Sequence, residues 1–296
     1  HTGTSAAAPL AAGIIALALS ANPNLTWRDV QHLIVRTSEY APLSANPGWQ
    51  INGAGLHFDV RFGFGLLNAG VLVATALNWT TVPDKHVCRV EAVPLGEDDS
   101  RLSSREIVNV IISVTKDCVV NYIEHVEAIV NVRYSRRGAL EIYLVSPQGT
   151  KVQLLSARPR DASNAGFVNW PLMSVATWGE QPKGIWKVIF IDKTHEHNIG
   201  NIGPTTLVIH GTTYMNNKQT KYDINEEAFE YIDNVNNGGD VAASNTVTYD
   251  GDVDDVPGEH KSGDGDSIND IDPTILAEVE KELQRIHHRK IYMAGI

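Results

Sequence analysis

Residues 1–19 read HTGTSAAAPLAAGIIALAL, and this stretch decides the N-terminal part of the fold. From Ser5 to Ala21 nearly every residue is small or aliphatic and none is charged, so a helix here is apolar on all sides. We therefore predict a buried helix at the centre of a layered α/β domain. Its most apolar run, Leu10 to Leu19, is too short to cross a bilayer, and we predict no transmembrane segment.

Ser5 falls in the first turn of that helix, where a serine hydroxyl is well placed for nucleophilic attack. Attack on a peptide carbonyl needs a base for the hydroxyl proton and donors for the developing oxyanion. The positive helix end and the Ser5 backbone N–H supply the second requirement. We expect Gly3 to leave room for substrate, the alanines at 6–8 to let a sheet approach, and Pro9 to be tolerated in the first turn. A bare Gly-Thr-Ser triplet favours a simple N-cap, so the assignment depends on the longer string.

Two more helices complete the first unit. Thr26 as N-cap with Asp29 three residues later predicts a second helix, with Val30, Leu33 and Ile34 on its apolar face. Residues 41–65 are rich in Gly, Pro and Asn, and Leu66 to Leu77 then predicts a third helix.

After Pro83 the sequence changes to alternating apolar runs separated by turn residues. This pattern predicts an antiparallel sandwich, an all-β unit after the α/β one. The predicted strands include Val126 to Tyr134, Leu140 to Val145, Val152 to Leu155, Trp186 to Ile191 and Thr206 to Ile209.

The net charge of −11 comes from one segment rather than from the whole chain. Residues 216–272 hold 15 Asp and Glu against 3 Lys, whereas residues 1–215 hold 17 acids and 17 bases. The near-neutral part argues against nucleic acid as a partner. The composition of residues 216–272 predicts a disordered acidic linker. Residues 273–296 predict a C-terminal amphipathic helix, with Pro273 in its first turn and Leu276, Val279, Leu283 and Ile286 on one apolar stripe.

The two cysteines and the two N-glycosylation sequons each allow more than one interpretation. Cys88 and Cys118 are either reduced and buried or paired, and pairing closes a loop of about 30 residues. Asn24-Leu-Thr26 and Asn78-Trp-Thr80 fit N-glycosylation in a secreted protein, but Thr26 also fits a helix cap and Asn78 a helix end.

The string HTGTSAAAP followed by LAAGIIALAL resembles the serine segment of subtilisin-like peptidases. Further stretches are similar to the kexin and furin branch, the proprotein convertases, and the resemblance covers residues 1 to about 213. Those stretches are Asn24 to His32 (NLTWRDVQH), Phe62 to Gly70 (FGFGLLNAG), Asn78 to Val82 (NWTTV), Arg136 to Gly138 (RRG), Gly166 to Trp170 (GFVNW) and Trp178 to Glu180 (WGE). Residues 37–40, 44–55 and 61–69 look most like the neuroendocrine convertases.

The resemblance implies a peptidase part at residues 1–80 and a jelly-roll-like P (Homo B) sandwich at residues 84–213. It implies Ser5 as nucleophile, His1 and Thr4 as substrate-binding residues, and a Cys88–Cys118 disulfide. It also implies a calcium-dependent serine endopeptidase of the secretory pathway, in the trans-Golgi or granule lumen or secreted, that cleaves precursors after paired basic residues. Expected partners are those precursors, the enzyme's own pro-segment and, through the C-terminal helix, a membrane.

Several family features are not matched in these residues. Subtilisin-type enzymes order their triad Asp, His, Ser, so the base, its Asp, the oxyanion-hole Asn and the calcium ligands are expected before His1. His1 itself is a poor base, and we expect the chain alone to be a fragment without activity. Ala139 stands where the family usually has Asp. Arg136-Arg137 is expected to be a loop or sheet-edge pair rather than a cleavage site, and Arg289-Lys290 is a better processing candidate.

A different class of function remains open at this point. The sandwich with its attached peptidase piece is also compatible with a non-catalytic module that binds or stabilises, and more weakly with a lectin-like role.

Overall fold

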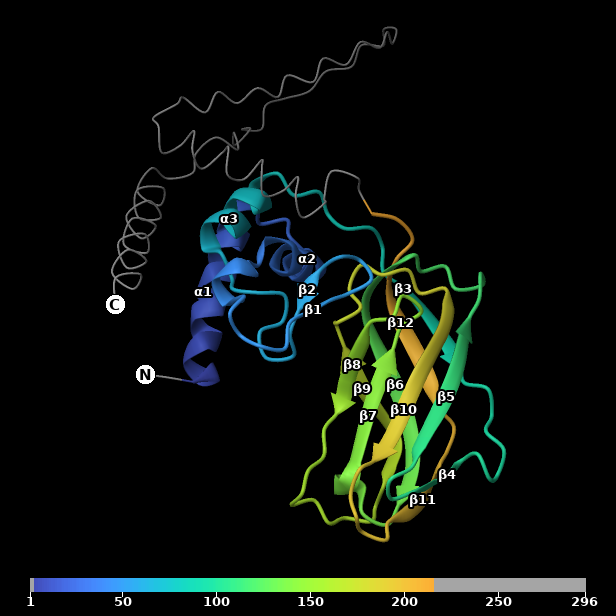
Figure 1. Ribbon diagram of the computed structural model, residues 1–296. Coiled ribbons are helices and arrows are strands. Elements are labelled where there is room, and N and C mark those ends of the chain that lie inside the picture. Colours follow the sequence, from blue (N-terminus) through green and yellow to red (C-terminus); the bar gives the residue numbers. More distant parts are fainter. Residues whose placement is uncertain (1–2, 216–296) are drawn as a thin grey trace, which may run out of the picture. The chain divides into compact units, whose positions relative to one another are not determined.

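The computed structural model describes residues 3–215 of the 296-residue chain. Three helices come first in the sequence, and a β-sandwich follows them (Figure 1). The predicted succession of an α/β peptidase part and an all-β unit is confirmed. The predicted acidic linker (216–272) and amphipathic helix (273–296) lie outside the described residues.

Helix α1 (Thr4–Ala21) forms as predicted but is not buried by the described residues. Among its residues Ala18 alone is buried, while Leu10 is 69% and Leu17 40% exposed. Residues 3–215 therefore do not supply the predicted burial, because α3 (Ala69–Leu77) covers one side of the helix and leaves most of its apolar surface open. The helix also extends beyond the run Leu10 to Leu19, and at 18 residues its length and composition suffice to cross a membrane, a test that soluble core helices also pass.

Helix α2 (Trp27–Thr37) begins at a complete capping box. The Thr26 hydroxyl accepts from the Asp29 backbone N–H, and the Asp29 carboxylate accepts from the Thr26 backbone N–H. Fully buried Asp29 also accepts from the Trp79 indole at 2.8 Å and from the Val82 N–H at 2.8 Å. Burial raises the pKa of Asp29, but these hydrogen bonds outweigh it and hold the pKa below its usual value. One carboxylate thus joins the start of α2 to the chain that leads into the sandwich.

Helix α3 starts three residues later than predicted because Asn68 is its N-cap, with its side chain accepting from the Val71 N–H. Leu66 instead forms an isolated β-bridge with Glu39. Between α2 and α3 lie a 3-10 turn (Ala41–Leu43) and a small hairpin of β1 (Gln50–Ile51) and β2 (His57–Phe58). The helices share a core formed by Ala18, Leu25, Leu33, Leu72, Ala76, Trp79 and Val82.

Two sheets form the sandwich. One has the order β5-β10-β7-β8, and the other has the order β3-β12-β6-β11-β4, with β9 also paired to β6. All of these pairings are antiparallel, as the alternating pattern predicts. The strands are β3 (His86–Glu91), β4 (Arg101–Ser103), β5 (Ile107–Val114), β6 (Tyr122–Tyr134), β7 (Leu140–Val145), β8 (Lys151–Leu155), β9 (Phe167–Ser174), β10 (Gly184–Asp192), β11 (Ile199–Ile202) and β12 (Thr206–Thr212).

The Cys88–Cys118 disulfide is present, with Cα atoms 5.5 Å apart. It joins β3 of one sheet to the loop that follows β5 of the other. The expected pairing is confirmed.

Hydrogen bonds connect the hairpin loop after β1 to the sandwich. The buried Asn52 amide donates to the carbonyls of Ala176 and Trp178, both at 2.9 Å. The Gly53 N–H donates to the buried Glu180 carboxylate at 2.9 Å. The described residues fall in one compact unit, and the predicted boundary between residues 80 and 84 stays a prediction.

Candidate functional site

Ser5 lies exposed in the first turn of α1. Gly3 is the N-cap with φ +95°, a left-handed conformation that disfavours side chains, and its carbonyl accepts from the N–H groups of Ala6 and Ala7. No heavy atom lies within 4 Å of the position that a Cβ at residue 3 would occupy. The positive φ angle, and not a lack of space, therefore favours glycine here. The Ser5 N–H belongs to the first turn, whose donors have no intrahelical acceptor. Hydroxyl and free N–H therefore meet at one exposed helix N-terminus.

Pro9 does not lie in the first turn, contrary to expectation. It is the sixth residue of α1, so the N–H that it lacks would have bonded to the Ser5 carbonyl. The proline thus removes one helical hydrogen bond at the carbonyl of Ser5 itself.

The structure describes one of the two residues predicted to bind substrate. His1 lies outside the described residues, and Thr4 is exposed at the first position of α1. Within residues 3–215 no side chain hydrogen-bonds to the Ser5 hydroxyl. Among residues 3–215 the predicted nucleophile therefore has a backbone donor beside its hydroxyl, but no side chain placed to act as its general base.

Both predicted glycosylation residues, Asn24 and Asn78, are exposed. Asn78 is the C-cap residue of α3, and Thr26 of the first sequon caps α2. The structural and modification roles of these residues are compatible, because the caps leave both asparagine side chains at the surface.

Arg136 and Arg137 are held by ion pairs at one end of the sandwich. Arg136 bonds to Glu196 and to the Pro159 carbonyl, and Arg137 bonds to Asp161 at 2.9 Å. This agrees with a loop pair rather than a free cleavage site.

A buried carboxylate that sequence reasoning did not single out joins α2 to the sandwich. Glu124 of β6 accepts from the Arg28 guanidinium (Nε–Oε2 3.2 Å) and from His32 (Nε2–Oε1 2.9 Å). Burial raises the pKa of Glu124, but the hydrogen bonds and charges of its two partners outweigh burial and lower the pKa to about 2. Burial lowers the pKa of His32, although its hydrogen bond to Glu124 opposes this shift.

The register of β6 explains why the Glu124 side chain is buried although the next residue, His125, faces outward. The pairing of β6 with β12 shifts between His210 and Gly211, which lie opposite His125 and Ile123. Glu124 is thus an extra residue, and a β-bulge of this kind re-aims side chains.

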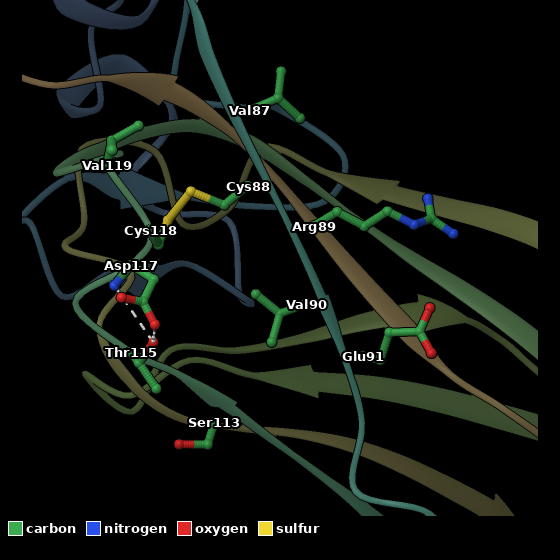
Figure 2. Close-up of a pocket in the computed structure, with 10 residues that line it drawn as sticks. All are labelled: Val87, Cys88, Arg89, Val90, Glu91, Ser113, Thr115, Asp117, Cys118 and Val119. Carbon is green, nitrogen blue, oxygen red and sulfur yellow. Dashed lines mark hydrogen bonds between the residues drawn. A yellow bond between two sulfur atoms is a disulfide. The ribbon is translucent and has the colours of Figure 1, made fainter.

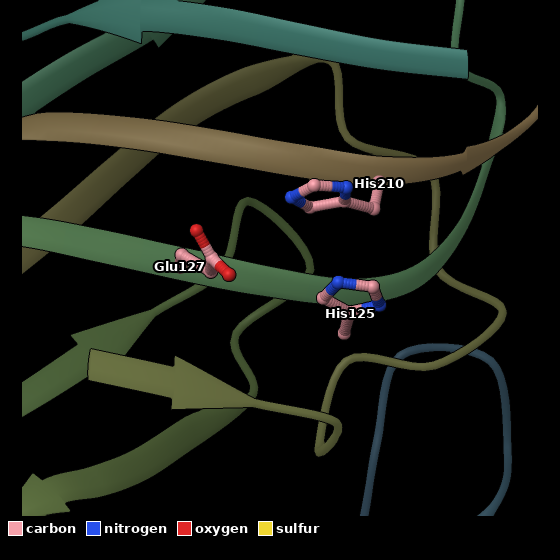
Figure 3. Close-up of side chains that lie close together, drawn as sticks. All are labelled: His125, Glu127 and His210. Atoms are coloured by element: carbon pink, nitrogen blue, oxygen red, sulfur yellow. The ribbon is translucent and has the colours of Figure 1, made fainter. Parts of the chain in front are cut away.

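On the outer side of this bulge two histidines and a glutamate meet (Figure 3). His125 and Glu127 are alternate residues of β6, and His210 of β12 stacks on His125 with ring centroids 4.2 Å apart and planes 13° apart. The three ligand atoms lie within 4.8 Å of one another. Burial lowers the pKa of both histidines, that of His125 to about 4 with a further contribution from His210.

A surface hollow lies beside the disulfide, between β3 and the loop after β5 (Figure 2). Thr115 donates to Asp117 there at 3.0 Å, and both are exposed. The hollow contains none of the predicted catalytic or substrate residues. Its lining residues are Val87, Cys88, Arg89, Val90, Glu91, Ser113, Thr115, Asp117, Cys118 and Val119.

The clustered side chains of residues 3–215 are not a set that calcium prefers. Within residues 3–215 the cluster His125, Glu127 and His210 is the one group of three or more candidate ligands that meets in space. Calcium prefers six to eight oxygen ligands, and two of these three ligands are imidazoles.

Two family descriptions match the chain. Residues 1–65 match the Subtilase family, and residues 123–209 match the Proprotein convertase P-domain. The first match contains Ser5, and the second contains β6 and most of the sandwich.

Curated relatives match 72% of the chain. An endoprotease bli of Onchocerca volvulus is 44% identical over 216 residues and is covered to 31% of its length. Furin of Rattus norvegicus is 48% identical over 214 residues and covered to 26%, and neuroendocrine convertase 2 of Drosophila melanogaster is 43% identical over 219 residues and covered to 33%. The chain thus spans about a quarter to a third of the length of these relatives.

Among solved structures, a serine protease of Aeromonas sobria matches with a TM-score of 0.63 and 21% identity. The match covers 71% of this chain and 44% of that protein. At this identity it supports the succession of a peptidase part and a sandwich, as a matter of fold alone.

Proposed function

Because the chain belongs to the subtilisin-like proprotein convertases and carries their P domain, we propose that it is part of a serine endopeptidase with Ser5 as nucleophile. The observation that carries the proposal is the position of Ser5 at an exposed helix N-terminus, within the residues that match the Subtilase family. There the backbone N–H of Ser5 is free to donate to the oxyanion of a substrate carbonyl.

In the proposed reaction the Ser5 hydroxyl gives its proton to a base outside the described residues and attacks the scissile carbonyl. The C–N bond then breaks, the amine leaves with that proton, and water hydrolyses the remaining acyl-enzyme. The left-handed Gly3 sets the entry into α1 and so aims the first turn. Thr4, exposed one residue before the nucleophile, is proposed to line the substrate channel together with His1.

The proposed substrates are precursor proteins cleaved after paired basic residues in the secretory pathway, in the trans-Golgi or in granules, as the resemblance implies. The disulfide and the two exposed sequon asparagines, Asn24 and Asn78, suit an oxidising compartment in which N-glycans are attached. Calcium dependence and the particular likeness to neuroendocrine convertase 1 belong to the same proposal.

The test is Ser5→Ala in the intact enzyme, with a dibasic fluorogenic peptide as substrate. We expect cleavage to fall by about 10⁶-fold, the loss typical of removing such a nucleophile, while the protein is secreted and folded as before. Ser20→Ala is a matched control, because Ser20 lies exposed near the other end of α1, and it should leave the rate unchanged. Persistent turnover in Ser5→Ala would disprove the assignment.

A stabilising role of the sandwich is a second function that specific contacts favour. The Arg28–Glu124 pair and the Asn52 hydrogen bonds join the peptidase part to the sandwich through buried polar groups. We propose that the P domain supports the peptidase part through these two junctions. Variants of the junction residues test this role below.

A further inference from the structure

We propose that His125, Glu127 and His210 form a transition-metal site on the sandwich, with Zn²⁺ as the ion it is best suited to bind. The three side chains converge on the outer face of the six-stranded sheet at the point where β6 carries its bulge (Figure 3). The site lies outside the proposed catalytic residues and does not depend on proteolysis.

The imidazole of His210 is the first reason for this inference. Both of its ring nitrogens are buried, yet neither has a hydrogen-bond partner among the described residues. A buried polar atom without a partner has lost its hydrogen bonds to water and gained none in return, so native proteins keep few of them. A metal ion bound to one nitrogen would satisfy that atom directly.

The second reason is the set of donor atoms that the three side chains bring together, two imidazole nitrogens and one carboxylate oxygen within 4.8 Å of one another. Within residues 3–215 Glu127 has no ion-pair partner, and it supplies the negative charge that a cation requires.

The ligand types select the metal. Two imidazoles and one carboxylate are a known zinc set, usually completed by a water in the fourth position. Zinc ligands around a tetrahedral ion lie about 3.3 Å apart, whereas the atoms here lie within 4.8 Å, so binding would draw the side chains together by rotation. The stacked rings would tilt out of their parallel arrangement, and nitrogen ligands make calcium a poor alternative.

The charges around the cluster are balanced rather than uniformly favourable. Lys85 opposes a cation, but it is exposed and its ammonium lies 5.9 Å from the Trp27 ring. Glu124 favours a cation from the buried side of β6, although Arg28 already neutralises much of its charge. When the negative charge of Glu127 is included, the positive and negative charges near the cluster nearly cancel. This charge balance permits a divalent ion to bind at the outer face of the sheet.

The experiment compares the chelator-treated full chain with a His125→Gln/His210→Gln double variant, each titrated with Zn²⁺ in a calorimeter at pH 7. We expect the original chain to bind one equivalent more than the double variant. Bound Co²⁺ should give a visible absorption band that the double variant loses. Glu127→Gln should keep the site but weaken it by about tenfold or more.

Controls separate this cluster from other histidines. His197 is exposed on the same domain, and His197→Gln should leave the extra equivalent and the Co²⁺ band unchanged. His287 and His288 add the same background to every variant. Equal stoichiometry in the original chain and the double variant would overturn the proposal and leave a simple stacked pair. If the double variant fails to fold by circular dichroism, an unchanged zinc affinity in Glu127→Gln overturns it instead.

Discussion

At the scale of single residues, Glu124 shows how one extra residue in a strand creates a junction. The bulge turns its carboxylate inward toward Arg28 and His32, while His125 keeps its outward direction. Removing one partner of a buried ion pair leaves the other charge uncompensated, which costs more than the pair contributes.

We therefore predict that Glu124→Gln lowers the free energy of unfolding by about 3 kcal/mol, because Arg28 loses its counter-charge in a nearly buried position. Denaturant titration followed by tryptophan fluorescence measures the change. Glu97→Gln is the matched control, since Glu97 is exposed, and it should change stability by less than about 0.5 kcal/mol. Equal stabilities of the two variants would contradict the assigned role.

The same residue predicts a pH dependence. Its folded pKa of about 2 lies below the usual 4.5, so its stabilisation is present above about pH 4.5 and is lost as the pH falls toward 2. The stability difference between the original chain and Glu124→Gln should shrink across that window. A difference that stays constant from pH 5 to pH 2.5 would contradict the depressed pKa.

Sequence reasoning succeeded at single residues where the partners are local. Thr26 and Asp29 are three residues apart, and the capping box follows from their order alone. Glu124 and Arg28 are 96 residues apart, and His125 and His210 are joined by strand pairing. No spacing rule in the sequence connects such pairs, because the register of β6 on β12 includes a bulge that alternation does not predict.

At the scale of elements, the disulfide provides a covalent cross-link between the two sheets, which no single strand does. It ties β3 to the loop after β5 and so links the two sheets at one end of the sandwich. A cross-link over 30 residues restricts the unfolded chain and stabilises the fold by about 3 to 4 kcal/mol in the chain-entropy model.

We predict that Cys88→Ala/Cys118→Ala lowers the free energy of unfolding by about 3 kcal/mol, and that the original chain loses the same amount under reducing conditions. Thermal unfolding with and without reductant measures both. The double variant should be insensitive to reductant, which serves as its internal control. A stability in the original chain that reductant leaves unchanged would show that the bond does not stabilise the sandwich.

Helix α1 is the element that the described residues leave largely uncovered. Its apolar composition correctly predicted a helix that requires cover, but composition does not identify the segment that supplies the cover. The described residues bring only α3 extensively against it, and Leu10 remains mostly exposed.

At the scale of the whole molecule, Asn52 is one of the residues that join the peptidase part to the sandwich. Its amide group donates to two sandwich carbonyls, and its side-chain oxygen accepts from the N–H groups of Ala54 and Leu56. All four bonds involve a side chain that is nearly inaccessible to water.

We predict that Asn52→Asp, which has the same shape, loosens this junction because a carboxylate oxygen would face the carbonyls of Ala176 and Trp178. The expected loss is about 3 kcal/mol, with faster proteolysis between the peptidase part and the sandwich. Limited trypsin digestion and thermal unfolding provide the two readouts. Asn109→Asp on the exposed face of β5 should behave like the original chain. Identical digestion of both variants would contradict the junction.

The pairing of β3 with β12 sets the order in which the sandwich is completed during synthesis. Cys88 of β3 lies opposite Ile209 of β12, about 120 residues later. At about 5 to 20 residues per second, the ribosome delivers the last strand on the order of 10 s after the first. Cys118 emerges much earlier, so the cysteine bridge is able to close while β3 still has no neighbour on its β12 side. The disulfide is thus available as a covalent tether for β3 during the interval before its partner strand β12 is synthesised.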